Sequence, residues 1–132
     1  MRIYLFLFFM VGVSILWLWF LFFITRKLTG AKVIAVIIIA LVGLVVFFGI
    51  KYYSFYLYDP KSFYIIPAHK LTYGGVRLFD FIYFSFVTIT TLGYGDIIPL
   101  HTLTKILTIL EVLMGVSFVG LILGRIVIKR ES

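Results

Sequence analysis

Long stretches without a charged residue constrain the fold of this chain more than any other feature. The first covers residues 3–24, IYLFLFFMVGVSILWLWFLFFI, and contains no Asp, Glu, Lys or Arg. A bilayer core of about 30 Å needs about 20 such residues, and a lone segment inside it can satisfy its backbone only as a helix. The run is too long for the apolar part of a signal peptide and no cleavage site follows it. We therefore expect a retained transmembrane helix.

Two later runs predict two more spanning helices. One covers residues 33–50, and the other extends from 102 to about 128, with Lys105 and Glu111 among its apolar residues. The whole chain is 64% hydrophobic and only 13% charged, a composition of the membrane class rather than of soluble domains. The predicted fold class is an all-α membrane protein.

The basic residues indicate contact with lipid rather than with nucleic acid, although the net charge is +7. They lie where apolar runs end, as expected of side chains that bind anionic headgroups. The 12 lysines and arginines divide evenly between the two faces, but one face carries its share densely beside helix ends (Arg26, Lys27, Lys32, Arg125, Lys129 and Arg130). We place that face in the cytoplasm and the N-terminus outside, in a multi-pass protein of the plasma membrane.

The region between the second and third runs does not have the pattern of a single helix. Residues 51–77 contain two prolines, a Gly-Gly pair and many tyrosines, which predicts an interfacial loop. Residues 78–91, LFDFIYFSFVTITT, are apolar again but too short to cross a bilayer. They predict a re-entrant helix, with Asp80 in its first turn at the positive end of the helix dipole.

The stretch TITTLGYGDIIP, residues 88–99, interrupts this apolar context with backbone that cannot stay helical. Irregular backbone at membrane depth is tolerated only when it is buried in protein or lines a watery cavity. Main-chain carbonyls can replace the water shell of a cation without adding net charge. Aiming successive carbonyls at one axis requires unusual backbone conformations at alternate residues, and Gly93 and Gly95 alternate. Thr91 adds a hydroxyl oxygen at the inner end.

The surroundings of this loop suggest how it is supported. We expect Tyr94 to wedge sideways against aromatic neighbours such as Tyr83 and Phe84. The partly negative C-terminal end of the short helix should point towards a waiting cation. Because one chain offers only one strip of carbonyls, several chains must surround an axis in closed cyclic symmetry.

The residues Thr91-Leu92-Gly93-Tyr94-Gly95-Asp96 resemble the filter of the potassium channels. FIYFSFVTIT resembles the pore helix of that family, and GVSFVGL resembles its glycine-bearing inner helix. The resemblance implies a homotetrameric pore domain of prokaryotic type at 31–132, after an N-terminal transmembrane helix and basic link at 1–30. Within the pore domain it implies an outer helix at 32–52, an outer loop at 53–77, a pore helix at 78–90, a filter at 91–95 and an inner helix at 102–129.

The resemblance also implies a function. K⁺ would be coordinated by the carbonyls of Thr91, Leu92, Gly93 and Tyr94 and by the Thr91 hydroxyl, with Gly95 as filter support. The predicted protein is a potassium-selective channel with K⁺ as the permeant ion, no organic cofactor and no enzymatic activity. The alternatives are a weakly selective cation channel of the same architecture and a non-conducting membrane scaffold.

Two positions depart from the family pattern. Leu92 stands where the family usually has Val or Ile, which leaves the carbonyl but changes the packing behind it. Val87 stands where some members carry a Glu that pairs with the filter aspartate. We therefore expect Asp96 to interact with the Tyr83 hydroxyl instead.

Glycines in the third run carry a separate prediction. By resemblance, Gly115 matches the hinge glycine at which the inner helix bends. The alternative is close helix packing, which small residues permit and which we favour for Gly120 and Gly124.

Glu111 is the one acidic residue within that run, and an ionisable group inside a membrane is a functional hypothesis by default. It lies one turn before Gly115 on the same helix face, so we expect a hydrogen bond to the pore helix at Ser85 or Thr88. A purely structural hydrogen bond is the alternative reading. The two histidines, His69 and His101, lie apart from any acidic cluster and do not predict a metal site.

Overall fold

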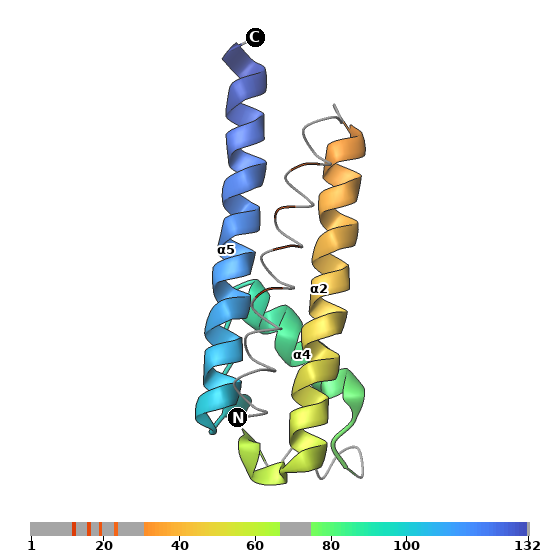
Figure 1. The fold of residues 1–132 in the computed structure, drawn as a ribbon, viewed down its shortest axis with the longest axis vertical. Coiled ribbons are helices and arrows are strands. Elements are labelled where there is room, and N and C mark those ends of the chain that lie inside the picture. The colour runs from red at the N-terminus through yellow and green to blue at the C-terminus, as the bar shows by residue number, and fades with distance from the viewer. Residues whose placement is uncertain are drawn as a thin grey trace. The chain divides into compact units, whose positions relative to one another are not determined.

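The computed structural model describes residues 31–66 and 75–131, together with Gly12, Leu16, Trp19 and Phe23. These four isolated residues are helical, but the predicted first span as a whole, and His69, lie outside the described residues. The described elements follow one another as α2 (Ala31–Tyr58), the short 3-10 helix η1 (Pro60–Ser62), β1 (Phe63–Ile65), α4 (Leu78–Ile89), β2 (Ile97–Pro99) and α5 (Thr102–Glu131) (Figure 1).

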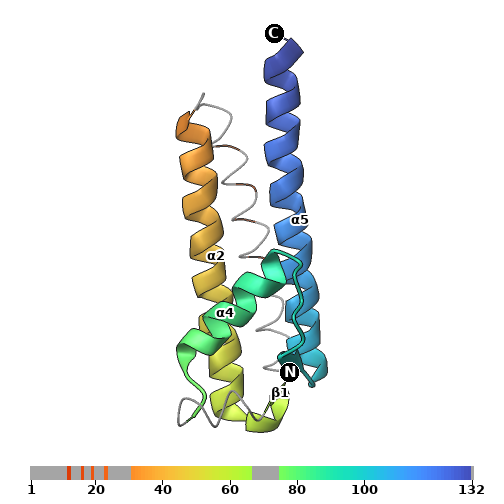
Figure 2. The ribbon, with the colours of Figure 1, turned by 180° about the vertical axis from the view of Figure 1, so that it is seen from behind.

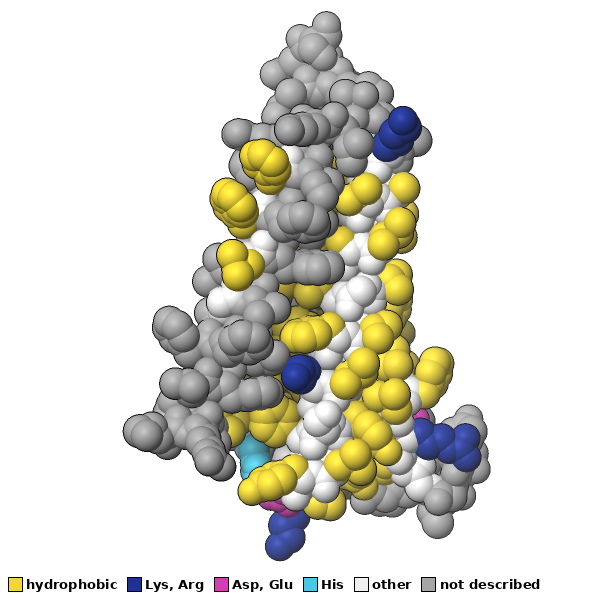
Figure 3. Space-filling view, turned by 45° about the vertical axis from the view of Figure 1, so that its right-hand side comes forward, with side chains coloured by type: hydrophobic (Ala, Val, Ile, Leu, Met, Phe, Trp, Pro, Cys, Tyr) yellow, Lys and Arg dark blue, Asp and Glu magenta, His cyan; other side chains and the backbone are white. Residues whose placement is uncertain are grey.

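Within the described residues, two helices are long and apolar enough to cross a membrane, Lys32–Tyr58 and Thr102–Gly124. Large apolar side chains are exposed along both, among them Ile39 and Ile109. Figure 3 shows hydrophobic side chains over much of the described part of one face, with few basic ones between them. In water such exposure would be unfavourable, but lipid tails accept it. The chain is therefore a predominantly helical membrane protein.

The outer helix is longer than predicted. We expected it to end at residue 52 and a loop to cover 53–77, but α2 continues to Tyr58. The helix stops at Asp59. This residue has an extended backbone because it precedes Pro60. The Asp59 carboxylate then accepts a hydrogen bond from the Lys61 amide at 2.9 Å. Tyrosines taken as interfacial loop residues are thus helical, and Tyr56 packs its ring on Phe81.

A two-stranded antiparallel sheet lies where irregular loops were expected. Phe63 pairs with Pro99, Tyr64 with Ile98 and Ile65 with Ile97. The amide of Leu100 donates to the Ser62 carbonyl at 2.8 Å and so extends the pairing. The sheet joins the segment after α2 to the segment before α5, and its strands are too short to produce a recognisable alternation in sequence.

The chain divides into two compact units, residues 1–40 and 41–132, and the second contains the candidate site. In it α4 runs obliquely from α2 to α5 (Figure 2). The helix ends at Ile89 with Thr90 as its C-cap, one residue from the predicted end at 90. Its first turn is closed by the Asp80 carboxylate, which accepts from the Arg77 amide at 2.7 Å. Asp80 therefore occupies the predicted first-turn position.

A glycine allows α2 and α4 to approach closely. A methyl group added at Gly49 would lie 2.8 Å from the Cα atom of Ile82, so only glycine fits this crossing. Beside it is a buried aromatic cluster contributed by α2, β1 and α4 (Phe48, Tyr52, Phe63, Phe81 and Phe84). Ring centroids in this cluster are 5.0 to 6.1 Å apart, within the range of favourable aromatic contacts. The cluster fixes the position of α4.

Candidate functional site

The loop after α4 has an alternating backbone conformation. Its φ angles are positive at Thr91 (+60°), Gly93 (+57°) and Gly95 (+77°), that is, at every second residue. Both glycines adopt the left-handed conformation for which they were singled out in the sequence. Thr91 was not predicted to do so, and for a residue with a Cβ this conformation costs about 1 kcal/mol. Successive carbonyls of a strip with this alternation can be directed to the same side.

The loop is tied directly to the end of α4. The amide of Thr91 donates to the Thr88 carbonyl at 2.9 Å, and the amide of Leu92 donates to the Val87 carbonyl at 3.0 Å. The partly negative end of this helix was expected to point towards a waiting cation, and the carbonyls of Val87 and Thr88 at this end are bonded to the loop itself. The partial negative charge of the helix end remains, and the loop begins in one defined direction.

The other end of the loop is tied to the sheet. The amide of Ile66, next to β1, donates to the Asp96 carbonyl at 3.1 Å. The Asp96 carboxylate accepts from the Ile97 amide at the start of β2, also at 3.1 Å. Residues 91–95, which we call the filter strip, are therefore anchored at both ends.

Tyr83 supports the filter strip from α4. Its ring stacks on that of Tyr94, with centroids 6.4 Å apart and an interplanar angle of 16°. Its hydroxyl is hydrogen-bonded to the Asp96 side chain, the contact expected when Val87 replaces an acid. Desolvation, and secondly this hydrogen bond, raise the pKa of Tyr83 to about 12. The phenol is thus neutral at physiological pH and can donate to Asp96.

Phe84 has a different position from the one predicted. It was expected beside Tyr94, but its ring packs on Tyr52 at 5.1 Å and on Phe63 at 5.8 Å. Phe84 lines the same cavity as Tyr94, but its ring contacts are with these two buried aromatic residues. Phe84 belongs to the aromatic cluster that positions α4.

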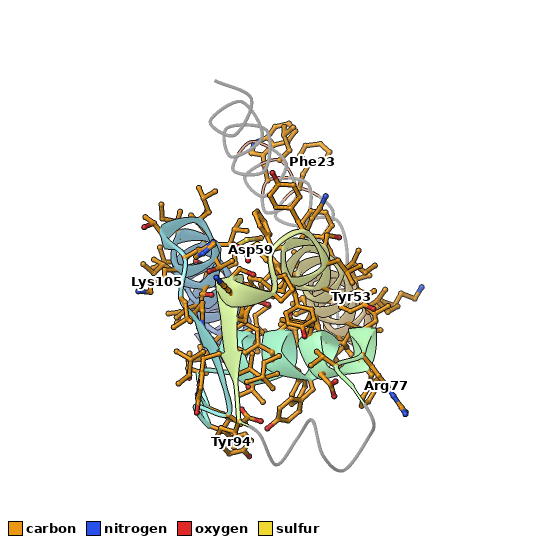
Figure 4. The ribbon with its side chains drawn as sticks, turned by 90° about the horizontal axis from the view of Figure 1, so that it is seen from below. Phe23, Tyr53, Asp59, Arg77, Tyr94 and Lys105 are labelled. Atoms are coloured by element: carbon orange, nitrogen blue, oxygen red, sulfur yellow. The ribbon has the colours of Figure 1, made fainter. Side chains whose placement is uncertain are left out.

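The filter strip is open on one side in a single chain. All of residues 91–95 are exposed, with Leu92 at 55% and Tyr94 at 66%. Figure 4 shows Tyr94 beyond one end of α4 and Arg77 at the other. A cavity of about 420 Å³ adjoins the strip and is lined also by Val87 on α4 and by Thr108 and Val112 on α5. One chain therefore does not enclose an ion.

Gly115 brings α5 against the end of α4. A methyl group added there would lie directly on the carbonyl oxygen of Ile89 and 2.9 Å from the Ile89 Cγ1 atom. Of the two readings of Gly115, the structure supports close packing. The same test at Gly120 and Gly124 meets no atom within 4 Å in the described part of the chain. The packing favoured for those two glycines is therefore not found within this part of the chain.

Glu111 bonds to α4, as predicted, and also to α2. It is fully buried, and its Oε1 atom accepts a hydrogen bond from the hydroxyl of Ser85. Its Oε2 atom accepts from the Tyr52 hydroxyl at 2.8 Å. Ser85 was one of the two partners expected. Tyr52 was missed, because nothing in the sequence distinguishes it from the neighbouring tyrosines.

His101 directly precedes α5 and makes an ordinary surface contact. Its Nε2 atom lies 3.5 Å from a carboxylate oxygen of Asp59, across the ends of two helices. Within the described residues no group of three or more histidine, aspartate or glutamate side chains could hold a metal ion. The described support of the filter strip comes from the Tyr83 ring and hydroxyl, the Asp96 carboxylate and main-chain hydrogen bonds.

These features define a class of protein: a predominantly helical membrane protein in which a short apolar helix presents an anchored, open loop of alternating backbone conformation. The sequence profile of a family described as ion channel matches residues 51–130. This match covers more than half of the chain, and the chain therefore belongs to that ion channel family. The family is one of channels, not of enzymes, as predicted.

Relatives of the chain are named as potassium channels. It is 38% identical over 95 residues to the two-pore potassium channel 4 of Arabidopsis thaliana, covering 70% of this chain and 30% of the relative. It is 34% identical over 77 residues to the two pore potassium channel b of Oryza sativa subsp. japonica, covering 58% and 22%. It is 31% identical over 70 residues to the voltage-gated potassium channel of Aeropyrum pernix, covering 53% and 24%.

The chain thus spans less than a third of the length of these relatives. The similarities confirm the predicted resemblance to the pore domains of potassium channels. They come from plants as well as from an archaeon, so the resemblance is not restricted to prokaryotic proteins.

Proposed function

We propose that this chain is the pore subunit of a potassium-selective channel and that four copies surround one conduction path. The observation that carries the proposal is the positive φ at every second residue of the filter strip, Thr91, Gly93 and Gly95. The carbonyls of Thr91, Leu92, Gly93 and Tyr94, with the Thr91 hydroxyl, would replace the water shell of K⁺. Because these groups carry no net charge, a bound ion can also leave.

The exposure of the strip supports an assembly around an axis. A strip of carbonyls on one chain contacts an ion from one side only, and its residues are exposed in this chain. Closed cyclic symmetry repeats the same strip around the ion. Four copies are the number that the resemblance to potassium channels implies.

The contacts that hold the filter strip favour a K⁺-selective channel over a weakly selective cation channel. Both ends of the strip are hydrogen-bonded to regular structure, and Tyr94 is stacked on Tyr83. Such anchoring would limit changes in the spacing between the carbonyls, and this supports discrimination between ions of different size. We place the channel in the plasma membrane with the N-terminus outside and the C-terminus in the cytoplasm, as the density of basic residues indicates.

The test is the reversal potential of the purified chain in planar bilayers with different mixtures of K⁺ and Na⁺, at equal total concentration, on the two sides. We expect a potential near the K⁺ equilibrium potential, whereas a potential near zero with measurable current would indicate the weakly selective channel. Absence of current would indicate the scaffold. Gly93→Ala should abolish K⁺ selectivity, since alanine disfavours φ of +57°. Gly120→Ala, a glycine outside the strip, is the matched control.

A further inference from the structure

One buried carboxyl group connects the three helices around the filter strip. Glu111 on α5 accepts hydrogen bonds from Ser85 on α4 and from Tyr52 on α2, and all three residues are fully buried. Packing alone does not require an acid here, because an apolar side chain of similar volume would fill the space. An ionisable group in a membrane interior is unfavourable unless its partners are well placed. The arrangement therefore specifies where α4 lies relative to α5.

A second contact repeats this one a helical turn further on. Gly115 follows Glu111 by four residues on α5, and Ile89 follows Ser85 by four residues on α4. Residues four apart share one face of a helix. The Glu111–Ser85 hydrogen bond and the Gly115–Ile89 backbone contact are thus two successive contacts between the same two faces. Together they fix both the position and the rotation of the last turn of α4.

That turn is the one that carries the filter strip. The carbonyl of Val87, between Ser85 and Ile89, accepts the amide of Leu92, and the carbonyl of Thr88 accepts the amide of Thr91. Moving or rotating this turn would move the first carbonyls of the strip. The Glu111 carboxyl is therefore linked to the strip by its hydrogen bond to Ser85, by the last turn of α4 and by the hydrogen bonds that the strip makes to that turn.

We infer that Glu111 is a positioning residue for the filter strip, which transmits the position of α5 to the first carbonyls through Ser85. It touches no ion, and it acts by fixing the last turn of α4. The consequence for ion selectivity rests on the proposed function, whereas the consequence for the order of the strip does not.

Four substitutions separate positioning from simple structural support. Glu111→Leu keeps the volume and removes both acceptors. Glu111→Gln can keep both contacts, because its amide accepts from one hydroxyl and donates to the other. Ser85→Ala and Tyr52→Phe each remove one donor and provide milder changes in case the leucine variant does not fold.

Two control variants remove hydroxyls that do not contact Glu111. Ser117→Ala lies on α5, where the hydroxyl bonds to the Leu113 carbonyl of its own helix. Tyr56→Phe keeps the ring that packs on Phe81. Each variant is assembled in liposomes, and hydrogen–deuterium exchange of peptides covering 86–96 is compared with that of peptides from the rest of α2 and α5. The K⁺ over Na⁺ permeability ratio is measured on the same preparations.

We expect exchange in 86–96 to rise about tenfold in Glu111→Leu, the effect of losing about 1.4 kcal/mol of local stability. Ser85→Ala should approach this value, Glu111→Gln should stay near wild type, and the two controls should not change. The permeability ratio should fall in the same order. Equal behaviour of the leucine and glutamine variants, or a loss of stability spread evenly over the chain, would overturn the inference. A wild-type chain without K⁺ preference would remove the proposed function, but the exchange measurements would still decide the role of Glu111.

Discussion

Replacing Gly115 by alanine distinguishes the two readings of this glycine by the sign of the change in stability. In the interior of an exposed helix, alanine is favoured over glycine by about 1 kcal/mol. At Gly115 the new methyl group would meet the Ile89 carbonyl and the Ile89 Cγ1 atom, the latter at 2.9 Å. Overpacking of this kind costs about 1–3 kcal/mol, and the upper part of the range applies when the obstacle is backbone. We therefore expect a net loss of about 1–2 kcal/mol.

The assay is thermal unfolding of the purified protein in detergent, with Gly120→Ala and Gly124→Ala as comparisons. An alanine at either position meets no atom within 4 Å in the described chain. These two variants should be unchanged or more stable by up to about 1 kcal/mol, while Gly115→Ala should melt earlier by about 3–6 °C. On the proposed function, the same variant should also lose K⁺ selectivity, because relief of the clash would move the end of α4.

A hinge without close packing predicts the opposite result. Alanine would then stiffen the helix and raise its stability, and the only functional effect would be on the fraction of time that the channel is open. A Gly115→Ala protein that melts as late as Gly120→Ala and keeps its selectivity would refute the packing argument.

Two further substitutions test the support of the pore helix and the filter strip. Gly49→Ala should destabilise the protein by a net of about 1–2 kcal/mol because of the contact with the Ile82 backbone. Equal melting of this variant and wild type would contradict the close crossing of α2 and α4. Tyr83→Phe should keep the stack on Tyr94 but lose the hydrogen bond to Asp96, and reduce stability by about 1–3 kcal/mol near neutral pH. Since the folded pKa of Tyr83 is about 12, above its ordinary value of 10, this difference should be constant below pH 10 and shrink as the pH rises towards 12. If the stability difference between wild type and Tyr83→Phe already declined near neutral pH, the pKa of Tyr83 would not be raised in the folded protein.

Prediction from sequence succeeded where the physical constraint is local. The left-handed backbone at Gly93 and Gly95 was predicted from the absence of a Cβ, and the ends of α4 were predicted within one residue. The end of α2 was misplaced, because tyrosine is compatible with an interfacial loop and with a helix. The stop is decided by Pro60 and by the packing of rings such as Tyr56 against α4.

Contacts between distant segments could be predicted only in part. Glu111 was expected to reach α4, since a buried acid needs a donor and Ser85 was one of two available. Its second donor, Tyr52, is 59 residues away in sequence. Which of several tyrosines on α2 faces the carboxyl depends on the crossing at Gly49, and this crossing is a property of the packed helices.

The sequence by itself therefore determined the membrane class, the short helix before the filter strip and the backbone freedom of the strip, because each follows from the chemistry of adjacent residues in a solvent that offers no hydrogen bonds. Only the tertiary structure decided what holds the strip in place. The strand pairing at its far end, the stack of Tyr83 on Tyr94 and the contacts of Glu111 and Gly115 with α4 all join residues distant in sequence. Such contacts depend on how helices cross, and helix crossings are set by the shapes of side chains from several segments at once.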